Sequence, residues 1–281
     1  MRHFYIFLIF SMGILLSACG NKEKTVFNYE DYEVDEDSSE QVAAVNENFR
    51  DTLSGTPPKR ADEYFDDFIY AFMRNPSYQR HRVAFPLTSI VDGVQHEIAE
   101  NQWQFNSLYA GDDVYMSVFP SAKSTKLIKD TKVSRVLVHD LEFQKNNIKE
   151  YQFEKLEGEW KLTKIESCSM DSVLVTSGFM NFFSKFASDE KFQQQHVSEM
   201  IHFSIFDEET METITGSLTR EQWPDFAPEL PTQRIMSVNY GQQNQGSDLR
   251  VVNITSTAGD AGVTLTFKKH GGTWMLTGFE S

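Results

Sequence analysis

Large apolar residues recur with the period of an α-helix in two separate segments of the chain. The spacing i, i+3, i+4, i+7 places four such residues on one face of a helix. The first set is Phe65, Phe68, Ile69 and Phe72, and the second is Phe179, Phe182, Phe183 and Phe186. Each member of the second set follows its counterpart by 114 positions (179 minus 65). Both stripes predict a helix that packs its aromatic face into a core.

A second, shorter helix is predicted after each stripe. Asn75 stands directly before Pro76, and Asp189 lies 114 positions after Asn75 (189 minus 75). Asn and Asp side chains accept a hydrogen bond from the first free N–H groups of a helix, and proline suits the first helical position. We therefore expect a new helix to begin at each of these residues.

The last third of each segment alternates apolar and polar residues, which is typical of strands. The pairs Glu157–Gly158 and Gly271–Gly272 suit a two-residue hairpin turn, which needs positive φ angles. Residues 158–167 and 272–281 share the frame G-x-W-x-L-T-x-x-E-S, with Trp160 matched to Trp274. Both segments are therefore expected to end in a hairpin of the same design.

These matches predict an α+β protein made of two tandem repeats, residues 61–168 and 175–281. Each repeat begins with helices and ends in a curved antiparallel sheet. Between these parts, Met116-Ser117-Val118 matches Met236-Ser237-Val238, and Trp103 matches Trp223. About 105 residues suffice for a repeat to bury a core of its own.

Composition limits the kinds of partner. The chain has 281 residues, a net charge of −15 and a pI near 4.9, which disfavours nucleic acids and anionic membrane surfaces. Its two cysteines, Cys19 and Cys168, lie in different contexts and imply no disulfide framework.

The first residues read as an export signal. Arg2 precedes an apolar run, and Leu16-Ser17-Ala18 leads directly to Cys19. This stretch resembles a bacterial lipoprotein signal, which implies a signal peptide over residues 1–18 and lipid attachment to Cys19. An uncleaved membrane helix is the alternative, but the run is shorter than the roughly 20 residues that a span needs. By the same resemblance, Gly20 in place of Asp indicates the outer membrane, on its periplasmic face or at the cell surface.

Residues 19–60 are expected to form a flexible tether. The segment is rich in acidic residues between Glu30 and Glu40 and closes with Pro57-Pro58. Acidic segments repel themselves and stay extended, and the proline pair marks a stop before the first repeat.

The paired aromatic stripes and the two matching endings resemble the nuclear transport factor 2-like fold, a cone-shaped sheet around helices. More narrowly, the chain resembles tandem-domain bacterial lipoproteins of domain-of-unknown-function family 4348. That family has no established activity, so the resemblance implies no catalytic residue and no cofactor. Enzymes with this fold place Asp, Tyr or His inside the cone, and we find no matching motif.

Individual candidates for chemistry are few. His81, His196 and His202 lack the spacing of a metal site, which needs three or four converging ligands. Asp112 and Asp113 offer paired carboxylates for acid–base work, but they follow Ala-Gly and favour a turn. Cys168 has no base beside it in the sequence and is expected to be inert or oxidisable.

Two further features suggest binding. Lysines recur every three residues in a basic cluster, which suits either an anionic glycan, lipid headgroup or acidic partner, or a solvated loop; they are Lys123, Lys126, Lys129 and Lys132. The aromatic, proline-rich loop Trp223–Pro231 is specific to the second repeat and suits either an exposed contact site or packing across the seam between repeats.

Three functions fit this sequence. The first is a lipid-anchored cell-envelope protein that binds an unidentified ligand or protein partner without catalysis. The second is an isomerase or hydrolase that acts on a small hydrophobic substrate, and it requires a deep pocket lined by Asp, Tyr or His with a shifted pKa. The third is a structural or assembly factor for a secreted partner. The sequence does not determine the ligand or the oligomeric state.

Overall fold

The structure is a computed structural model that describes residues 62–112, 114–170, 177–243, 246–257 and 262–281. The described residues belong to one compact unit. The predicted signal peptide 1–18, the lipid-attachment residue Cys19 and the tether 19–60 lie outside them.

The two aromatic stripes form the long helices α2 (Phe65–Arg74) and α4 (Ser177–Ser188). All four stripe residues of α2 are buried, at 0–3% exposure. In α4 three of the four are buried and Phe182 is half-buried. The prediction that both stripes face a core is therefore confirmed, with one position at the margin.

The short helices also begin as predicted. Asn75 caps α3 (Pro76–His81) by accepting a hydrogen bond from the Tyr78 N–H at 3.0 Å. Asp189 caps α5 (Glu190–Gln195) by accepting one from the Phe192 N–H, also at 3.0 Å. Each cap satisfies a helix donor that has no partner within the helix.

Six strands follow each helix pair, and their order along the chain is the same. The first six are β1 (Val83–Val91), β2 (Val94–Ile98), β3 (Val114–Phe119), β4 (Arg135–Glu142), β5 (Asn147–Leu156) and β6 (Glu159–Ser169). The second six are β7 (Val197–Asp207), β8 (Glu212–Thr219), β9 (Arg234–Asn239), β10 (Leu249–Ser256), β11 (Val263–His270) and β12 (Thr273–Glu280). Short helical turns lie between them: η2 (Glu100–Gln102), η3 (Ala122–Lys129), η4 (Phe143–Lys145) and α6 (Trp223–Phe226).

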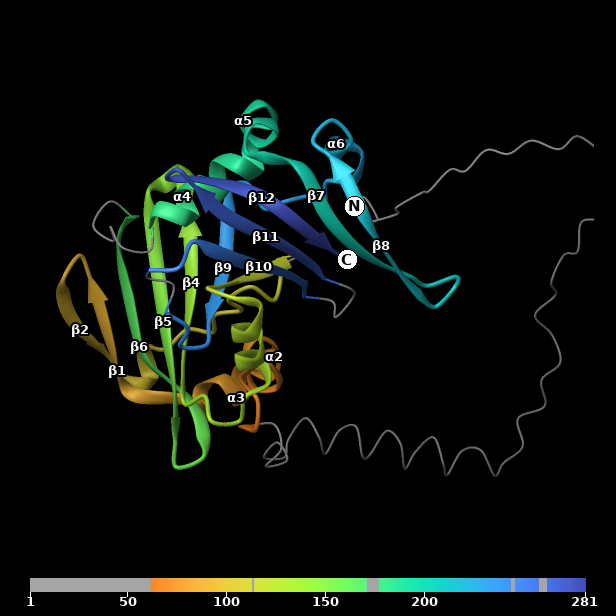
Figure 1. The fold of residues 1–281 in the computed structure, drawn as a ribbon. Helices are drawn as coiled ribbons and strands as arrows, with labels where there is room; N and C mark the ends of the chain where they lie inside the picture. Colours follow the sequence, from red (N-terminus) through yellow and green to blue (C-terminus); the bar gives the residue numbers. More distant parts are fainter. Residues whose placement is uncertain (1–61, 113, 171–176, 244–245, 258–261) are drawn as a thin grey trace, which may run out of the picture. The chain divides into compact units, whose positions relative to one another are not determined.

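All twelve strands join one sheet, in the order β2-β1-β6-β5-β4-β9-β3-β10-β11-β12-β7-β8. The order reads as the same six-strand pattern from either end, except that β3 and β9 have changed places. Strand β4 pairs with β9, and β10 pairs with β3. The two exchanged strands meet in parallel at Met116 and Ser237. Figure 1 shows β9 between β4 and β10.

The strand exchange also determines which strands contribute to each hydrophobic core. The first cluster of buried residues combines α2 and β4–β6 with Met236 and Val238 of β9. The second combines α4 and β10–β12 with Met116 and Val118 of β3. Separate tandem domains, each with a complete sheet of its own, are thus not confirmed, because each core is finished by a strand from the other half.

The sheet is also mixed, whereas the sequence predicted antiparallel pairing. Strands β1 and β6 run parallel, as do β12 and β7. The reason is that β1 and β7 directly follow α3 and α5, and each lies beside the last strand of its own half, β6 or β12. The Leu162 N–H donates to the Arg82 carbonyl and the Leu276 N–H to the His196 carbonyl, both at 2.8 Å.

The two hairpin turns and the two tryptophans match closely. Glu157–Gly158 and Gly271–Gly272 all have positive φ, from 53° to 88°, which confirms the predicted turns. The Trp160 ring lies 5.2 Å from Phe65 at 77°, and Trp274 lies 5.2 Å from Phe179 at 80°. The shared sequence frame therefore specifies the same edge-to-face contact in both halves.

Candidate functional site

Large side chains fill the space between helices and sheet in both halves. Phe153 is completely buried and lies 5.3 Å from both Phe65 and Phe72. Phe267 is completely buried against α4, with ring distances of 5.1–6.2 Å. These interiors are packed like ordinary protein cores.

One carboxyl group lies among aromatic residues at the margin of the first core. Asp66 is the second residue of α2 and is half-buried. Its Oδ1 accepts a 2.6 Å hydrogen bond from the hydroxyl of Tyr240, the residue after β9. Burial raises the pKa of Asp66 to about 6, although the bond from Tyr240 acts in the opposite direction. The strand exchange brings this pair together, because its members are 174 residues apart.

Two more phenols complete this group. Tyr109 and Tyr115 lie with ring centroids 4.9 Å apart. Burial raises the pKa of both phenols, and the negative charge of Asp66 raises them further. We call Asp66, Tyr109, Tyr115 and Tyr240 the carboxyl–phenol cluster. Near neutral pH its carboxyl can exchange a proton while its phenols remain hydrogen-bond donors.

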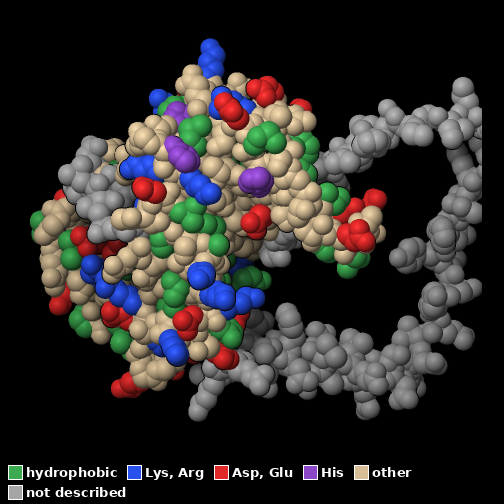
Figure 2. Space-filling model, viewed as in Figure 1, with side chains coloured by type: hydrophobic (Ala, Val, Ile, Leu, Met, Phe, Trp, Pro, Cys, Tyr) green, Lys and Arg blue, Asp and Glu red, His purple; other side chains and the backbone are tan. Residues whose placement is uncertain are grey.

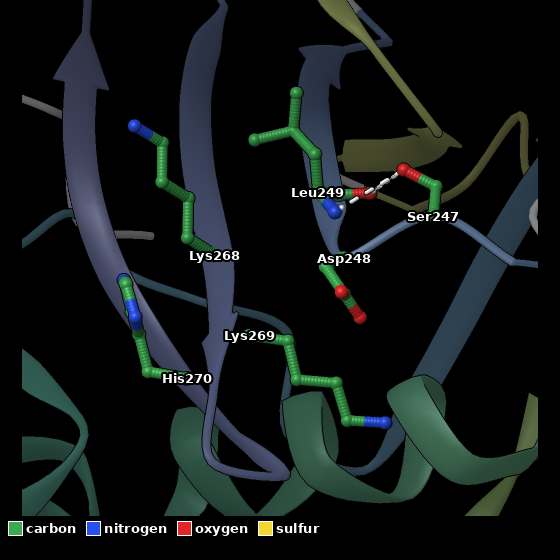
Figure 3. A pocket seen from close by; sticks show the side chains of 6 residues that line it. All are labelled: Ser247, Asp248, Leu249, Lys268, Lys269 and His270. Atoms are coloured by element: carbon green, nitrogen blue, oxygen red, sulfur yellow. Dashed lines mark hydrogen bonds between the residues drawn. The ribbon is translucent and has the colours of Figure 1, made fainter.

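A shallow groove of about 330 Å³ lies at the end of β11, away from this cluster in sequence. It is lined by Ser247, Asp248, Leu249, Lys268, Lys269 and His270. Figure 3 shows Lys268 and His270 on one side of β11 and Lys269 on the other. The Ser247 hydroxyl is bonded to the carbonyls of Pro120 and Leu249 at 2.9 and 3.2 Å. The groove is open and lined mainly by surface residues, so it does not form the deep pocket that an enzyme of this kind requires.

The predicted lysine cluster forms the exposed face of η3 and the turn after it. Lys123, Lys126, Lys129 and Lys132 are all exposed. Leu127 and Ile128, on the same turn of chain, pack against the first core and fix the segment in place. Figure 2 shows Lys and Arg side chains gathered over the part of the surface where η3 lies. The four ammonium groups are therefore displayed together from a fixed support.

The three candidate histidines do not converge. His81 is exposed on α3, His196 ends α5 and His202 is exposed on β7. Each ring bonds locally, to Ser77, Phe192 and Ser217 respectively. Within the described ranges no group of three or more His, Cys, Asp or Glu side chains could hold a metal ion.

Asp112 takes part in an ion-pair cluster. Its carboxylate accepts two hydrogen bonds from Arg234 Nη1, at 3.0 and 3.1 Å. The carboxylate of Asp140 accepts hydrogen bonds from Nε and Nη2 of the same guanidinium, at 2.7 and 2.9 Å. Arg234 begins β9 and Asp140 lies on β4, so this cluster fastens an exchanged strand to its neighbour. Asp113 lies outside the described residues.

The other candidates are structural. Cys168 is half-buried and packs against the second core. Trp223 is completely buried, donates its Nε1–H to Gln193 at 3.1 Å and meets Phe279 edge-on at 5.7 Å. Of the two readings left open for this loop, exposed contact does not apply to Trp223, because its indole fills the second core.

Sequence reasoning missed the carboxyl–phenol cluster and a second polar pair on β4 and β5. His139 Nε2 lies 2.9 Å from Glu150 Oε2, and this bond lowers the pKa of Glu150. The available signal was an acidic residue directly beside an aromatic stripe. It is weak, because the partners of Asp66 come from distant parts of the chain.

The fold belongs to the nuclear transport factor 2-like class. A crystal structure of an NTF2-like protein from Bacteroides fragilis matches with a TM-score of 0.71 and 29% sequence identity, over 80% of this chain and 98% of that one. More specifically, the family model described as "Domain of unknown function (DUF4348)" matches residues 45–281. The chain belongs to this family. No curated protein matches it.

The helices in the described part of the chain are all too short or too polar to cross a membrane.

Proposed function

We propose that this protein is a lipid-anchored, non-catalytic component of the outer membrane that binds a ligand or protein partner through two NTF2-like halves. Cys19 carries the lipid in this proposal, as the Leu-Ser-Ala-Cys stretch indicates. Duplication of one ancestral unit is supported by the matching tryptophan contacts and by the strand order, which repeats from either end of the sheet.

The observation that carries a binding function is the filled interior of both halves. Phe153, Trp160 and Phe267 are buried between the helices and the sheet, where an interior substrate pocket would have to lie. Recognition is thus assigned to the outer surface, where contacts with another molecule do not require the core to open.

The lysine cluster on η3 and the turn after it is the surface feature that suits this role best. Four cations on one fixed segment stand out in a chain of net charge −15. An anionic partner gains favourable electrostatic contacts there, and the surrounding negative charge repels it elsewhere. The partner class is therefore an acidic protein surface or an anionic glycan or lipid headgroup.

Replacing Lys123, Lys126, Lys129 and Lys132 by Gln tests this proposal. Partner capture from detergent-solubilised membranes should fall about tenfold or more, which corresponds to a loss of roughly 1.4 kcal/mol. The matched control replaces four exposed or half-exposed lysines elsewhere, Lys145, Lys161, Lys185 and Lys191, with the same change in net charge. Labelling with a palmitate analogue, compared with Cys19→Ser, tests the anchor separately.

Equal capture by both quadruple variants would contradict the assignment to η3. A secreted protein that co-purifies in a fixed one-to-one ratio would favour the assembly-factor role. Loss of the captured partner from the wild-type protein at high salt would indicate that charge is the main attraction.

Catalysis is the second candidate, and the carboxyl–phenol cluster is the observation that favours it. Burial raises the pKa of Asp66 to about 6, and its carboxyl accepts a hydrogen bond from Tyr240, an arrangement that suits acid–base chemistry. Opening the first core beside Asp66 is needed before a substrate can reach it. A crystal structure of protein extracted from cells tests this alternative, with ligand density against Asp66 supporting it.

A further inference from the structure

The hairpin of β7 and β8 carries an unusual share of exposed apolar side chains. Of the nine large hydrophobic side chains that are exposed among the described residues, four belong to this hairpin: Met200 (51%), Phe206 (48%), Met211 (72%) and Ile214 (50%). Figure 1 shows the hairpin standing away from the rest of the described residues. In Figure 2 its hydrophobic side chains lie beside acidic ones at the tip.

The outer edge of β8 has the chemistry of an unprotected strand. β8 ends the sheet, and its only strand neighbour among the described residues is β7. From Thr213 to Thr219 it contains no charged residue and no proline, and residues 212–217 are all exposed. Natural edges are usually protected by such residues. The opposite edge, β2, carries His96 and Glu97.

A local feature of the hairpin provides a place for one more apolar side chain. Phe203 pairs with Gly216, and its ring lies over the glycine so closely that a Cβ there would meet ring atoms at 2.7 Å. Ile205 pairs with Ile214 on the same face. A strand added outside β8 would bring its own side chains next to this aromatic ring.

We propose that β8 pairs antiparallel with β8 of a second copy of this chain, about a two-fold axis at Thr215. In this register Ile214 lies opposite Gly216 of the second copy and covers that copy's Phe203 ring. The same contact forms twice, as a two-fold axis requires. The two twelve-stranded sheets then become continuous across the dimer.

Charge and pattern favour a second copy as the occupant. The free edge accepts a neutral, β-branched strand with an apolar residue beside Gly216, and β8 itself has this pattern. Glu212 lies opposite Leu218 of the second copy in this register, so the two Glu212 carboxylates are not opposed. A strand with a charge in its centre would leave that charge against Ile214 or Phe203. This inference does not depend on the lysines of η3.

Site-directed cross-linking in membranes tests the pairing with the full chain. Thr215→Cys, in a Cys168→Ser background, should give a cross-linked dimer with a short bismaleimide. In the proposed register this residue lies opposite the same residue of the second copy. Gln95→Cys on the opposite edge strand β2 is the matched control and should give at least about tenfold less dimer.

Dimer formation at Thr215 but not at Gln95 supports the proposal. Equal yields at the two positions, or no dimer at Thr215, overturn it. A cross-linked product with a different protein overturns the choice of a second copy and assigns the edge to that protein instead.

A second measurement separates pairing from folding. Ile214→Lys should shift the full chain in detergent from dimer to monomer in sedimentation, because it places two ammonium groups beside apolar rings. Ile214→Val should keep the dimer. A dimer that survives Ile214→Lys, with unchanged thermal unfolding, overturns the proposed interface.

Discussion

At the scale of single residues, Asp66 is a half-buried carboxyl group whose pKa is raised to about 6. Burial among aromatic residues disfavours its charged form, and the hydrogen bond from the Tyr240 hydroxyl offsets this effect only partly. The folded chain therefore holds a proton on Asp66 more tightly than the unfolded chain does. Asp66 makes the stability of the protein depend on pH in the opposite sense from a salt-bridged carboxylate.

Asp66→Asn should stabilise the protein above pH 6 and leave it unchanged near pH 4. The stability of the wild type falls as pH rises from 3.8 to about 6, since the folded state gives up its proton later than the unfolded state. The loss is up to about 3 kcal/mol, and the Asn variant avoids it. Urea unfolding at pH 4 and pH 7.5 measures this difference.

Asp67→Asn is the control, because Asp67 is exposed on the same helix turn. A parallel pH profile for wild type and Asp66→Asn would contradict the role of burial.

Phe153→Ala and Phe267→Ala should destabilise the protein by similar amounts, about 3–5 kcal/mol each. Both rings are completely buried and contact the aromatic stripe of their own half. Chemical denaturation of the two variants checks this. Phe105→Ala, at a residue 44% exposed, should cost much less, and a large difference between the two core variants would argue against equivalent halves.

Sequence patterns predicted the residues of the cores better than those of the candidate site. Phe65 and Phe179 are identified by periodicity, because burial repeats with the turn of the helix. Asp66 and Tyr240 meet only through the strand exchange, and no local pattern records a contact across 174 residues. The pKa of Asp66 is raised mainly by burial in the folded core, which local sequence patterns do not report, so the sequence did not reveal it.

At the scale of elements, the exchanged strands depend on contacts that are not apolar. Strand β9 is paired along its whole length with β4, and Arg234 binds Asp140 and Asp112 at its first residue. The bidentate geometry with Asp140 fixes the start of β9 against β4. This cluster is half-exposed, so it contributes more to register than to total stability.

Arg234→Ala should lower stability by about 1–3 kcal/mol, because the carboxylate of Asp140 loses a charged partner. Amide exchange should accelerate in β9 and β4 more than in β11 and β12. Lys161→Ala removes the longer, exposed ion pair with Glu159 at 3.6 Å and should cost less than about 1 kcal/mol. Uniform acceleration across the sheet would show that the cluster does not hold the exchanged strand in particular.

Helices, caps and hairpin turns could be predicted because each depends on neighbouring residues. The exchange of β3 and β9 could not be predicted from the sequence. Met116-Ser117-Val118 and Met236-Ser237-Val238 have the same apolar pattern, so either strand satisfies either core. The choice between them rests on connection lengths and long-range pairing, which periodicity does not report.

At the scale of the whole molecule, the exchange makes the two halves dependent on each other. A chain cut between residues 170 and 177 should give fragments that fail to fold alone as cooperative monomers. Co-expressed, the fragments should recover one cooperative unfolding transition, since each supplies the central strand of the other core. Calorimetry and size-exclusion chromatography of each fragment and of the pair measure this.

A fragment that melts cooperatively as a monomer would contradict this dependence and favour independent domains.

The comparison with the NTF2-like structure from Bacteroides fragilis confirms the fold class expected from the sequence. The boundaries 61–168 and 175–281 remain predictions, as does the lipid on Cys19.

The exchange of β3 and β9 also affects how selection acts on the chain. A substitution at Met236 or Val238 changes the packing of the first core, so we expect a compensating change to lie around α2 rather than around α4. Deletion of either half would remove the strand that completes the sheet and core of the other half.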